Sequence, residues 1–295
     1  MHMEITKAII PVAGKGTRFL PATKETPKEM LSILNYPMIY YVVKEAFESG
    51  IKEVLFVTSS GKESIENFFD QNTGLESFLQ SRGKEKELAL IRDISKKIEV
   101  KTVRQKQQLG LGHAVLMAKS FISSGENFAV LLGDDLIDGK VPCIKQLIEV
   151  SKKFDQGSVI GVMEVPKEDT QKYGIVGGEF VDDKTLCMDR MVEKPTPENA
   201  PTNLATPGRY ILNQRIFELL ETIPKGAGGE YQLTDAIEAL AKEQKVYAHI
   251  FNGDRFDTGQ VPGYIDATLH FALKDPELKS HTIKLMEKYL ENHRS

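Results

Sequence analysis

A short glycine loop, Gly14-Lys15-Gly16-Thr17-Arg18, follows an apolar run that ends at Ala13, and Lys28 comes shortly downstream. A glycine loop at the end of a strand lets backbone N–H groups point at an anion without a Cβ in the way. Arg18 and Lys28 can add the positive charge that a polyphosphate needs. The combination predicts an enzyme that holds a nucleoside triphosphate by its phosphates.

The loop differs from two common phosphate-binding loops. The dinucleotide pattern G-x-G-x-x-G requires a third glycine, and Phe19 stands at that position. The pattern G-x-x-x-x-G-K-[ST] is also absent from this segment. An NAD-dependent dehydrogenase is therefore disfavoured, and a plain turn remains the alternative interpretation of the two glycines.

Acidic residues follow two other strand-like runs. Asp134 and Asp135 come directly after the apolar run Phe128–Leu132, and Asp257 lies in Phe256-Asp257-Thr258-Gly259. Ligands of an open α/β sheet bind at the carboxyl ends of its strands, and Mg²⁺ prefers oxygen ligands and phosphate partners. These acids are candidate metal ligands. Solvated loop acids, or a local turn at Asp257, are the alternatives.

Two further segments contain polar groups that suit a nucleobase and a sugar phosphate. The Gln105 amide can meet an acceptor and a donor of a base at once, with Gly110 nearby. Glu193 can accept hydrogen bonds from sugar hydroxyls, and Lys194 can hold a phosphate as a point charge. From the residues alone, a polar loop and an exposed Glu-Lys pair are the favoured interpretations of these two segments.

Strand-like and helix-like runs alternate along the first half, which predicts βαβ units and a Rossmann-like α/β fold with a mostly parallel, mixed sheet flanked by helices. The expected strands are 8–13, 53–58, 98–103 and 127–132, followed in the second half by 158–165, 174–181 and 186–193. The expected helices are 37–47, 63–79 with Gly74 as a candidate break, 114–121, 214–222, 232–243, 261–271 and 276–292.

Composition narrows the function classes. The 295 residues are 41% hydrophobic, which is enough for one large core. A net charge of −4 without a long basic stretch disfavours a nucleic-acid partner. Cys143 and Cys187 lie far apart, which favours a reducing cytoplasm over a disulfide framework. We expect neither a signal peptide nor a membrane helix, because no run approaches ~20 apolar residues.

The G-x-G-T-R loop with its downstream Pro27-Lys28 resembles the signature of the sugar-1-phosphate nucleotidyltransferases. Within that family, the segment Phe19–Leu31, FLPATKETPKEML, looks like the bacterial UTP–glucose-1-phosphate uridylyltransferases. The resemblance covers about residues 7 to 272. It implies the glycosyltransferase-A-like architecture of this family.

The resemblance also implies roles for individual residues. The implied nucleotide-binding residues are Ala13, Gly14, Gly16, Thr17, Arg18, Lys28, Gln105, Gly110 and Asp134. The implied sugar-phosphate-binding residues are Asp135, Gly174, Glu193, Lys194, Gly208 and Arg209. The implied Mg²⁺ ligands are Asp134 and Asp257, and the implied catalytic residues are Arg18, Lys28, Asp134 and Lys194.

The implied reaction is Mg²⁺-dependent: glucose 1-phosphate attacks the α-phosphorus of UTP, which yields UDP-glucose and pyrophosphate. The nearest alternative is a glucose-1-phosphate thymidylyltransferase that uses dTTP, because uracil and thymine share one hydrogen-bonding edge, or a related nucleotidyltransferase that uses another sugar phosphate. A non-catalytic nucleotide-sugar-binding regulator is an alternative of another class.

We expect one domain over 1–273, with a nucleotide-binding part over about 7–140 and a sugar-phosphate-binding part over about 141–273. We also expect a separate C-terminal helix over 274–295, a candidate for the interface of a homodimer or homotetramer.

Overall fold

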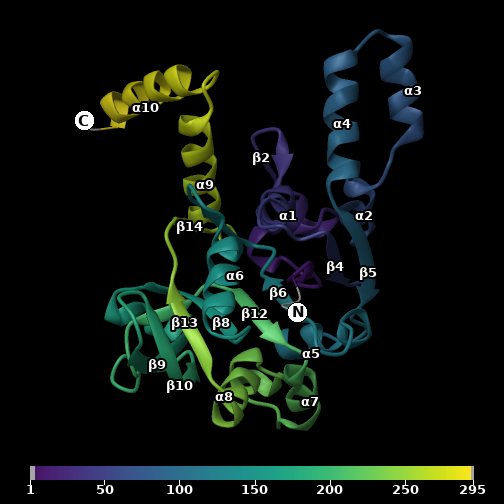
Figure 1. Ribbon diagram of the computed structural model, residues 1–295. Coiled ribbons are helices and arrows are strands. Elements are labelled where there is room, and N and C mark those ends of the chain that lie inside the picture. The colour runs from purple at the N-terminus through teal and green to yellow at the C-terminus, as the bar shows by residue number, and fades with distance from the viewer. Residues whose placement is uncertain (1–3, 294–295) are drawn as a thin grey trace.

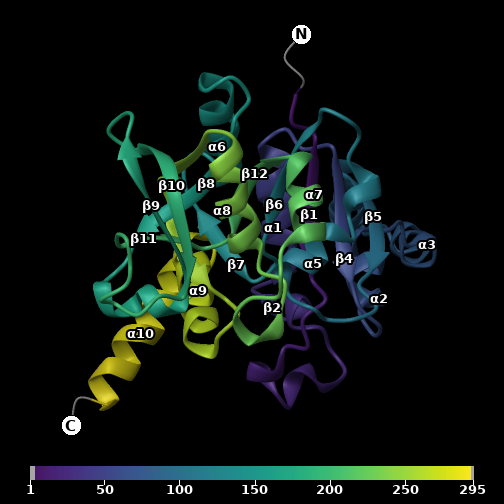
Figure 2. The same ribbon diagram turned by 90° about the horizontal axis from the view of Figure 1, so that it is seen from below.

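The computed structural model describes residues 4–293, in which a ten-stranded sheet is covered by helices on both faces (Figure 1). The strand order is β11-β9-β10-β13-β8-β12-β6-β1-β4-β5, and Figure 2 shows these strands side by side. The predicted mixed α/β fold is therefore confirmed. The ends of the predicted domain and C-terminal helix, residues 1–3 and 294–295, lie outside the described part of the chain.

One half of the sheet is parallel and comes from the first half of the chain. Its strands are β6 (Asn127–Leu131), β1 (Lys7–Pro11), β4 (Glu53–Thr58) and β5 (Glu99–Arg104). Successive residues of β1 face opposite sides, so Ile9 lies in one hydrophobic core while Ala8 and Ile10 lie in the other. The strands β1, β4 and β6 are buried on both faces and read as continuous apolar runs, whereas the edge strand β5 alternates apolar and polar residues, and these two patterns revealed them in the sequence.

Helices cover the two faces. On the Ile10 side lie α1 (Met38–Glu48), α2 (Glu63–Phe69) and α6 (Cys143–Lys153), whose apolar side chains join that core. On the Ile9 side lie α5 (Leu111–Leu116), α7 (Arg215–Thr222) and α8 (Leu233–Glu243), seen in front of the strands in Figure 2. The fold thus has three layers, with the sheet between two layers of helices, and the strands of the sheet present the candidate residues.

The other half of the sheet is mainly antiparallel. Its strands are β8 (Ser158–Glu164), β9 (Gly174–Phe180), β10 (Thr185–Glu193), β11 (Leu204–Thr206), β12 (Arg209–Asn213) and β13 (Val246–Ile250). Only β13 and β8 pair in parallel there, among the described strands. Helix α6 and strands β11, β12 and β13 were not predicted.

Two small two-stranded sheets lie outside the main sheet. The strands β7 (Asp135–Asp138) and β14 (Asp254–Asp257) pair antiparallel, with Asp257 directly opposite Asp135. The strands β2 (Ser32–Ile33) and β3 (Tyr36–Pro37) form the other pair. Short 3₁₀ helices are η1 (Thr17–Phe19), η2 (Ala22–Lys24), η3 (Lys28–Met30), η4 (Lys119–Phe121), η5 (Lys167–Lys172) and η6 (Ala227–Gly229). The β7–β14 pairing joins two segments that are distant in sequence and both acidic.

The helix predicted over 63–79 is not continuous. The chain breaks after α2 and resumes as α3 (Thr73–Ser81), where the Asn72 side chain accepts a hydrogen bond from Leu75 N at 3.0 Å. Gly74 lies inside α3 and is not the break. Helix α4 (Glu85–Lys97) was missed because only Leu88 and Ile94 of its side chains are buried, so its apolar stripe is narrow.

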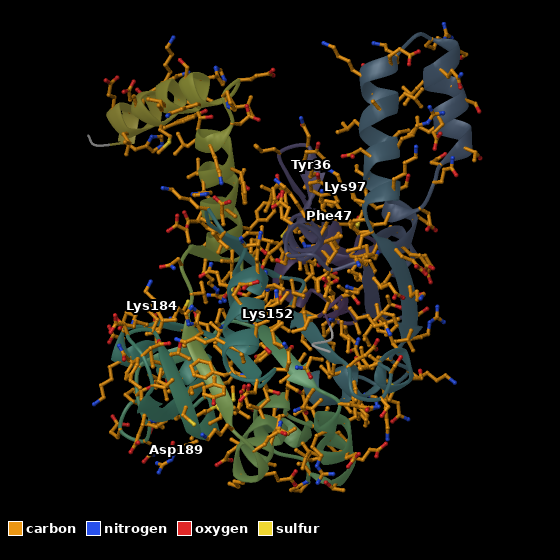
Figure 3. All side chains as sticks on the ribbon, viewed as in Figure 1. Tyr36, Phe47, Lys97, Lys152, Lys184 and Asp189 are labelled. Carbon is orange, nitrogen blue, oxygen red and sulfur yellow. The ribbon has the colours of Figure 1, made fainter. Side chains whose placement is uncertain are left out.

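Two helical arms project from the same side of the body: α3–α4, and α9 (Val261–Lys274) with α10 (Lys279–His293) (Figure 1). At the base of α4, the Lys97 ammonium lies 5.9 Å from the centre of the Phe47 ring (Figure 3). The predicted terminal helix corresponds to α10, which buries no side chain. None of the helices over 4–293 is long and apolar enough to cross a membrane.

A buried ion pair joins the layers on the α1 side. Arg209, at the start of β12, has no exposed surface, and its guanidinium contacts both carboxylate oxygens of Glu45 on α1 at 2.8 to 3.1 Å. Glu45 also accepts a hydrogen bond from the Ile144 N–H in the first turn of α6. A buried charge requires such a partner, because an ion taken out of water is otherwise strongly destabilising.

Replacing Glu45 with glutamine is therefore expected to lower the free energy of unfolding by about 3 kcal/mol, because the Arg209 charge stays buried without its counter-ion. Urea unfolding measures this change. The matched control is Glu48→Gln on the same helix, which breaks the exposed 3.8 Å Lys44–Glu48 pair and should cost less than about 1 kcal/mol. Equal losses of unfolding free energy in the two variants would contradict the larger contribution expected from the buried Arg209–Glu45 pair.

Candidate active site

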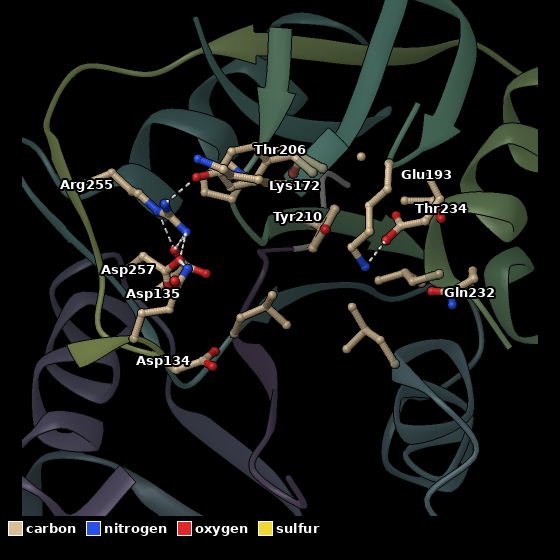
Figure 4. A pocket seen from close by; sticks show the side chains of 18 of the residues that line it. Asp134, Asp135, Lys172, Glu193, Thr206, Tyr210, Gln232, Thr234, Arg255 and Asp257 are labelled. Atoms are coloured by element: carbon tan, nitrogen blue, oxygen red, sulfur yellow. Dashed lines mark hydrogen bonds and ion pairs between the residues drawn. The ribbon is translucent and has the colours of Figure 1, made fainter. Parts of the chain in front are cut away.

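A cavity of about 450 Å³ opens where the parallel half of the sheet meets the antiparallel half (Figure 4). It gathers side chains from several separate parts of the chain. The sequence-predicted residues that line it are Arg18, Asp134, Asp135, Gly174, Glu193, Lys194 and Asp257. These residues are far apart in sequence, and the fold brings them together in one cavity.

The glycine loop is shaped to receive the Lys28 side chain. Gly16 has a φ of 64°, a left-handed conformation that glycine adopts without strain. A Cβ on Gly16 would lie 3.0 Å from Lys28 Cβ, and one on Gly14 would lie 4.0 Å from Lys28 Nζ. Gly16 therefore leaves room for Lys28 to pass close to the loop, whereas a Cβ on Gly14 would make only an ordinary contact with Lys28.

Lys28 reaches from the loop to Asp134 and forms an ion pair with its Oδ2. Burial lowers the pKa of Lys28, but the Asp134 and Glu29 charges outweigh this effect and raise it. Burial likewise raises the pKa of Asp134, but the Lys28 charge and hydrogen bond reverse the shift, so the Asp134 pKa lies below its usual range. Both groups are charged at neutral pH.

A second buried ion pair lies behind the first and was missed in the sequence. Lys62 Nζ donates to Glu29 Oε2 at 2.5 Å, and the two side chains are 7% and 1% exposed. Burial dominates both groups, raising the pKa of Glu29 and lowering that of Lys62. The one sequence signal that could have identified Glu29 is its position next to Lys28.

The carboxylates of Asp134 and Asp257 meet over Gly259. A Cβ on Gly259 would lie 2.7 Å from Asp134 Oδ2 and 3.2 Å from Asp257 Oδ1. Across residues 4–293, no group of three or more histidine, cysteine, aspartate or glutamate side chains could hold a metal. Two carboxylates over a space kept open by glycine nevertheless fit Mg²⁺, which uses one or two carboxylates and takes its other ligands from phosphates and water.

Arg255 is a cavity residue that the sequence analysis missed. Its guanidinium forms an ion pair with Asp135, donates to the Tyr173 hydroxyl at 2.9 Å, and lies 3.8 Å from Asp257 Oδ2 (Figure 4). Asp135 and Asp257 face each other across the β7–β14 strand pair, so a cation is needed between these like charges. The two-residue spacing of Arg255 and Asp257, which places them on one face of a strand, could have revealed it.

The opposite end of the cavity holds the sugar-phosphate candidates. Lys194 Nζ lies 2.7 Å from Glu193 Oε1, and Lys194 is 57% exposed while Glu193 is 14% exposed. Lys194 has a φ of 46°, which is rare for a residue with a side chain, and its N–H donates to Tyr173 O at 2.9 Å. A Cβ on Gly174 would lie 2.8 Å from Thr234 Cγ2, so this glycine allows close packing beside the cavity wall.

The predicted base-reading residues lie beside the glycine loop. Gln105 is buried, and its Nε2 lies 3.2 Å from Gly110 O and 2.9 Å from His113 Nδ1. Gly110 has a φ of 102°, and a Cβ there would lie 2.8 Å from Tyr231 O. The glycine is therefore required by close packing of residues 109–112 against residues 230–232, whatever its role toward a base.

Gln105 and Gly14 also line a second, larger cavity of about 720 Å³. The Ala13 carbonyl accepts hydrogen bonds from Ser59 Oγ at 3.1 Å and Gln108 Nε2 at 2.5 Å, and Thr17 is exposed on the loop. Neither Ser59 nor Gln108 was singled out in the sequence.

The prediction that Arg209 contacts the sugar phosphate is corrected by the structure. Its guanidinium is fully buried against Glu45 and donates to the carbonyl oxygens of Leu132 and Asp135. Gly208 does not line the cavity either; it has a φ of 112°, and a Cβ there would collide with the Leu132 side chain. The Pro207 and Tyr210 side chains on either side of this pair line the cavity instead.

Comparisons with known proteins identify relatives over nearly the whole chain. A family model described as nucleotidyl transferase matches residues 7–273. A UTP–glucose-1-phosphate uridylyltransferase of Staphylococcus epidermidis is 47% identical over 288 residues, which is 98% of this chain and 99% of that protein.

Solved structures agree with this result. The UTP-bound UGPase of Acinetobacter baumannii is 43% identical, with a TM-score of 0.88 over 96% of this chain and 98% of that one. A UDP-glucose pyrophosphorylase complexed with UDP-glucose is 42% identical, with a TM-score of 0.84 over 92% of this chain and 100% of that one.

Asp135 provides a test of the electrostatics of the cavity. Burial raises the pKa of Asp135 to about 7, helped by Asp134 and Asp257 and opposed by Arg255 and Arg209. The side chain of an aspartate in an unfolded chain has a pKa of about 4. Between roughly pH 4 and 7, the folded protein therefore keeps a proton on Asp135 that the unfolded chain has lost.

The free energy of unfolding of the wild type, relative to Asp135→Asn, should therefore fall as the pH rises through this window, by up to about 1.4 kcal/mol per pH unit, and level off above it. Urea unfolding of both proteins at several pH values measures the difference. A difference that stays constant across the window would mean that Arg255 keeps Asp135 ionised throughout.

Proposed function

Because the chain belongs to the nucleotidyl transferase family, we propose that it transfers UMP from UTP to glucose 1-phosphate, forming UDP-glucose and releasing pyrophosphate. The observation that supports this most directly is the near full-length similarity to uridylyltransferases, in a chain whose cavity has Arg18 and Asp134 at one end and Glu193 and Lys194 at the other. The two ends suit a triphosphate and a sugar phosphate.

The proposed reaction needs no protein nucleophile. A sugar phosphate is already anionic, so its oxygen can attack the α-phosphorus of UTP in line with the departing pyrophosphate. Catalysis then consists of positioning and charge stabilisation, as in other phosphoryl transfers. The protein's task is to hold two polyanions next to each other.

We assign this task to the cations of the cavity. Arg18 and Lys28 bind the triphosphate beside the glycine loop, where backbone N–H groups add further donors. Lys194 holds the phosphate of glucose 1-phosphate and aims its oxygen, and Glu193 accepts hydrogen bonds from the glucose hydroxyls. Arg209 is excluded from this set because it is buried with Glu45.

We propose that Asp134 and Asp257 hold Mg²⁺. Bound there, the ion would neutralise charge on the phosphates of both substrates. Lys28 also pairs with Asp134 Oδ2, so the lysine adds positive charge next to the proposed ion site. Asp135 and Arg255 support the Asp257 side of the same site.

We also propose a cellular location and an oligomeric state for the enzyme. Cys143 and Cys187 are both unpaired, which suits a reducing cytoplasm. Helix α10 buries no side chain of its own, which suits an interface in a homodimer or homotetramer.

A direct assay tests the reaction: pyrophosphate release with Mg²⁺ and glucose 1-phosphate, comparing UTP with dTTP at equal concentration. We expect strong preference for UTP. Preference for dTTP would contradict the assignment of uracil as the base and would favour a thymidylyltransferase. No turnover with either nucleotide would favour the non-catalytic regulator.

The metal assignment predicts that Asp134→Asn lowers turnover by at least about 100-fold without unfolding the protein, because the variant loses a charge that stabilises the reacting phosphates. The same assay with a Mg²⁺ titration measures the loss. Asp138→Asn is the control: Asp138 ends strand β7, which begins directly after Asp134, but its carboxylate contacts His270 and Lys274. Full activity of Asp134→Asn would refute the assigned role.

A further inference from the structure

The turn that presents Asp134 is held by side chains from distant segments. It runs from Leu132 to Asp135, between the end of β6 and the start of β7. Arg209 donates to the carbonyl oxygens at both ends of the turn, to Leu132 O at 3.3 Å and to Asp135 O at 2.6 Å. The backbone of the turn is thus fixed on either side of Asp134.

The carbonyl of Asp134 itself has a different partner. Thr258 Oγ1 donates to Asp134 O at 2.7 Å, and the Thr258 side chain has no exposed surface. Thr258 lies between Asp257 and Gly259 in sequence, so it belongs to the segment that supplies both the second carboxylate and the space between the two. One buried hydrogen bond therefore ties the Asp134 turn to the Asp257 segment.

We propose that Thr258 is a positioning residue that sets the separation of the Asp134 and Asp257 carboxylates, with Arg209 as its support on the other side of the turn. The proposal rests on the proposed metal site. The β7–β14 pairing aligns Asp135 with Asp257, but Asp134 lies one residue before that strand and needs another constraint. Without the Thr258 hydroxyl, the carbonyl of Asp134 would lose this partner, and Arg209 would hold only the two ends of the turn and not the Asp134 peptide between them.

The separation matters because Mg²⁺ demands near-ideal geometry at short ligand distances. Groups that orient metal ligands without touching the metal typically change metal affinity by about 10- to 100-fold when mutated. Thr258 acts through the backbone of Asp134, so its removal should weaken metal binding while leaving the sugar-phosphate end of the cavity unchanged.

The experiment compares Thr258→Val, which keeps the shape but removes the hydroxyl, with Thr258→Ser, which keeps the hydroxyl. Mn²⁺ binding is measured by electron paramagnetic resonance with UTP present and no sugar phosphate, so that no turnover occurs. We expect Thr258→Val to bind Mn²⁺ at least about 10-fold more weakly than the wild type, and Thr258→Ser to bind it like the wild type. In the assay, Thr258→Val should lower kcat with little change in the KM for glucose 1-phosphate.

A matched control removes a buried hydroxyl elsewhere. Thr185 is 1% exposed, and its hydroxyl pairs with His249 Nδ1 at 3.0 Å. It begins the strand that ends at the cavity residue Glu193, so it lies at the far end of that strand and does not line the cavity. Thr185→Val should leave Mn²⁺ binding unchanged.

The outcomes separate this proposal from the one on which it rests. Wild-type Mn²⁺ affinity in Thr258→Val, or equal losses in the Val and Ser variants, would overturn the positioning role while the metal site stands. A wild-type protein that turns over UTP but binds no Mn²⁺ would overturn the metal site and this role together. If Thr258→Val does not fold, Thr258→Ala replaces it with the same expected weakening and the same contradicting result.

Discussion

The ion pair between Lys28 and Asp134 joins the two segments on which the cavity depends. Lys28 comes from the segment after the glycine loop, and Asp134 comes from the turn after β6. A carboxylate enclosed by protein in this way would take up a proton more readily without a nearby cation, since burial disfavours its charged form. Lys28 keeps the Asp134 carboxylate ionised and also lies against the glycine loop. One side chain therefore sets both the charge state of Asp134 and the packing of the loop.

Other buried cations repeat this arrangement around the same turn. Arg209 pairs with Glu45 below the turn, and Arg255 pairs with Asp135 beside it. Breaking such a pair is destabilising because an unpaired charge stays in the protein interior. Each of these buried carboxylates thus has a cation as its partner within the fold.

Much of the parallel half of the fold followed from the sequence, because strands such as β4 and β6 are continuous apolar runs with clear ends. The motif residues that line the cavity were found for a similar reason: their types and spacing are local. Helix α4 was missed because a long polar arm has little apolar signal. Arg209 was misassigned because its partner, Glu45, lies 164 residues away, and no local pattern shows that a charged side chain is buried. Arg255 gained a role only through the β7–β14 pairing, which brings it to Asp135 from the other end of the chain.

The packing of residues 109–112 against 230–232 has a mechanical consequence. Gly112 N donates to Tyr231 O and Tyr231 N donates to Leu109 O, both at 2.8 Å, so the segment that leads into α5 beside the predicted base site is bonded to a segment of the second half. Glu230 and Gln232 of that segment line the cavity between the halves. Because these two hydrogen bonds are made by the backbone, they hold the loop next to Gln105 and the cavity segment 230–232 in one fixed relation, whatever side chains the two segments carry.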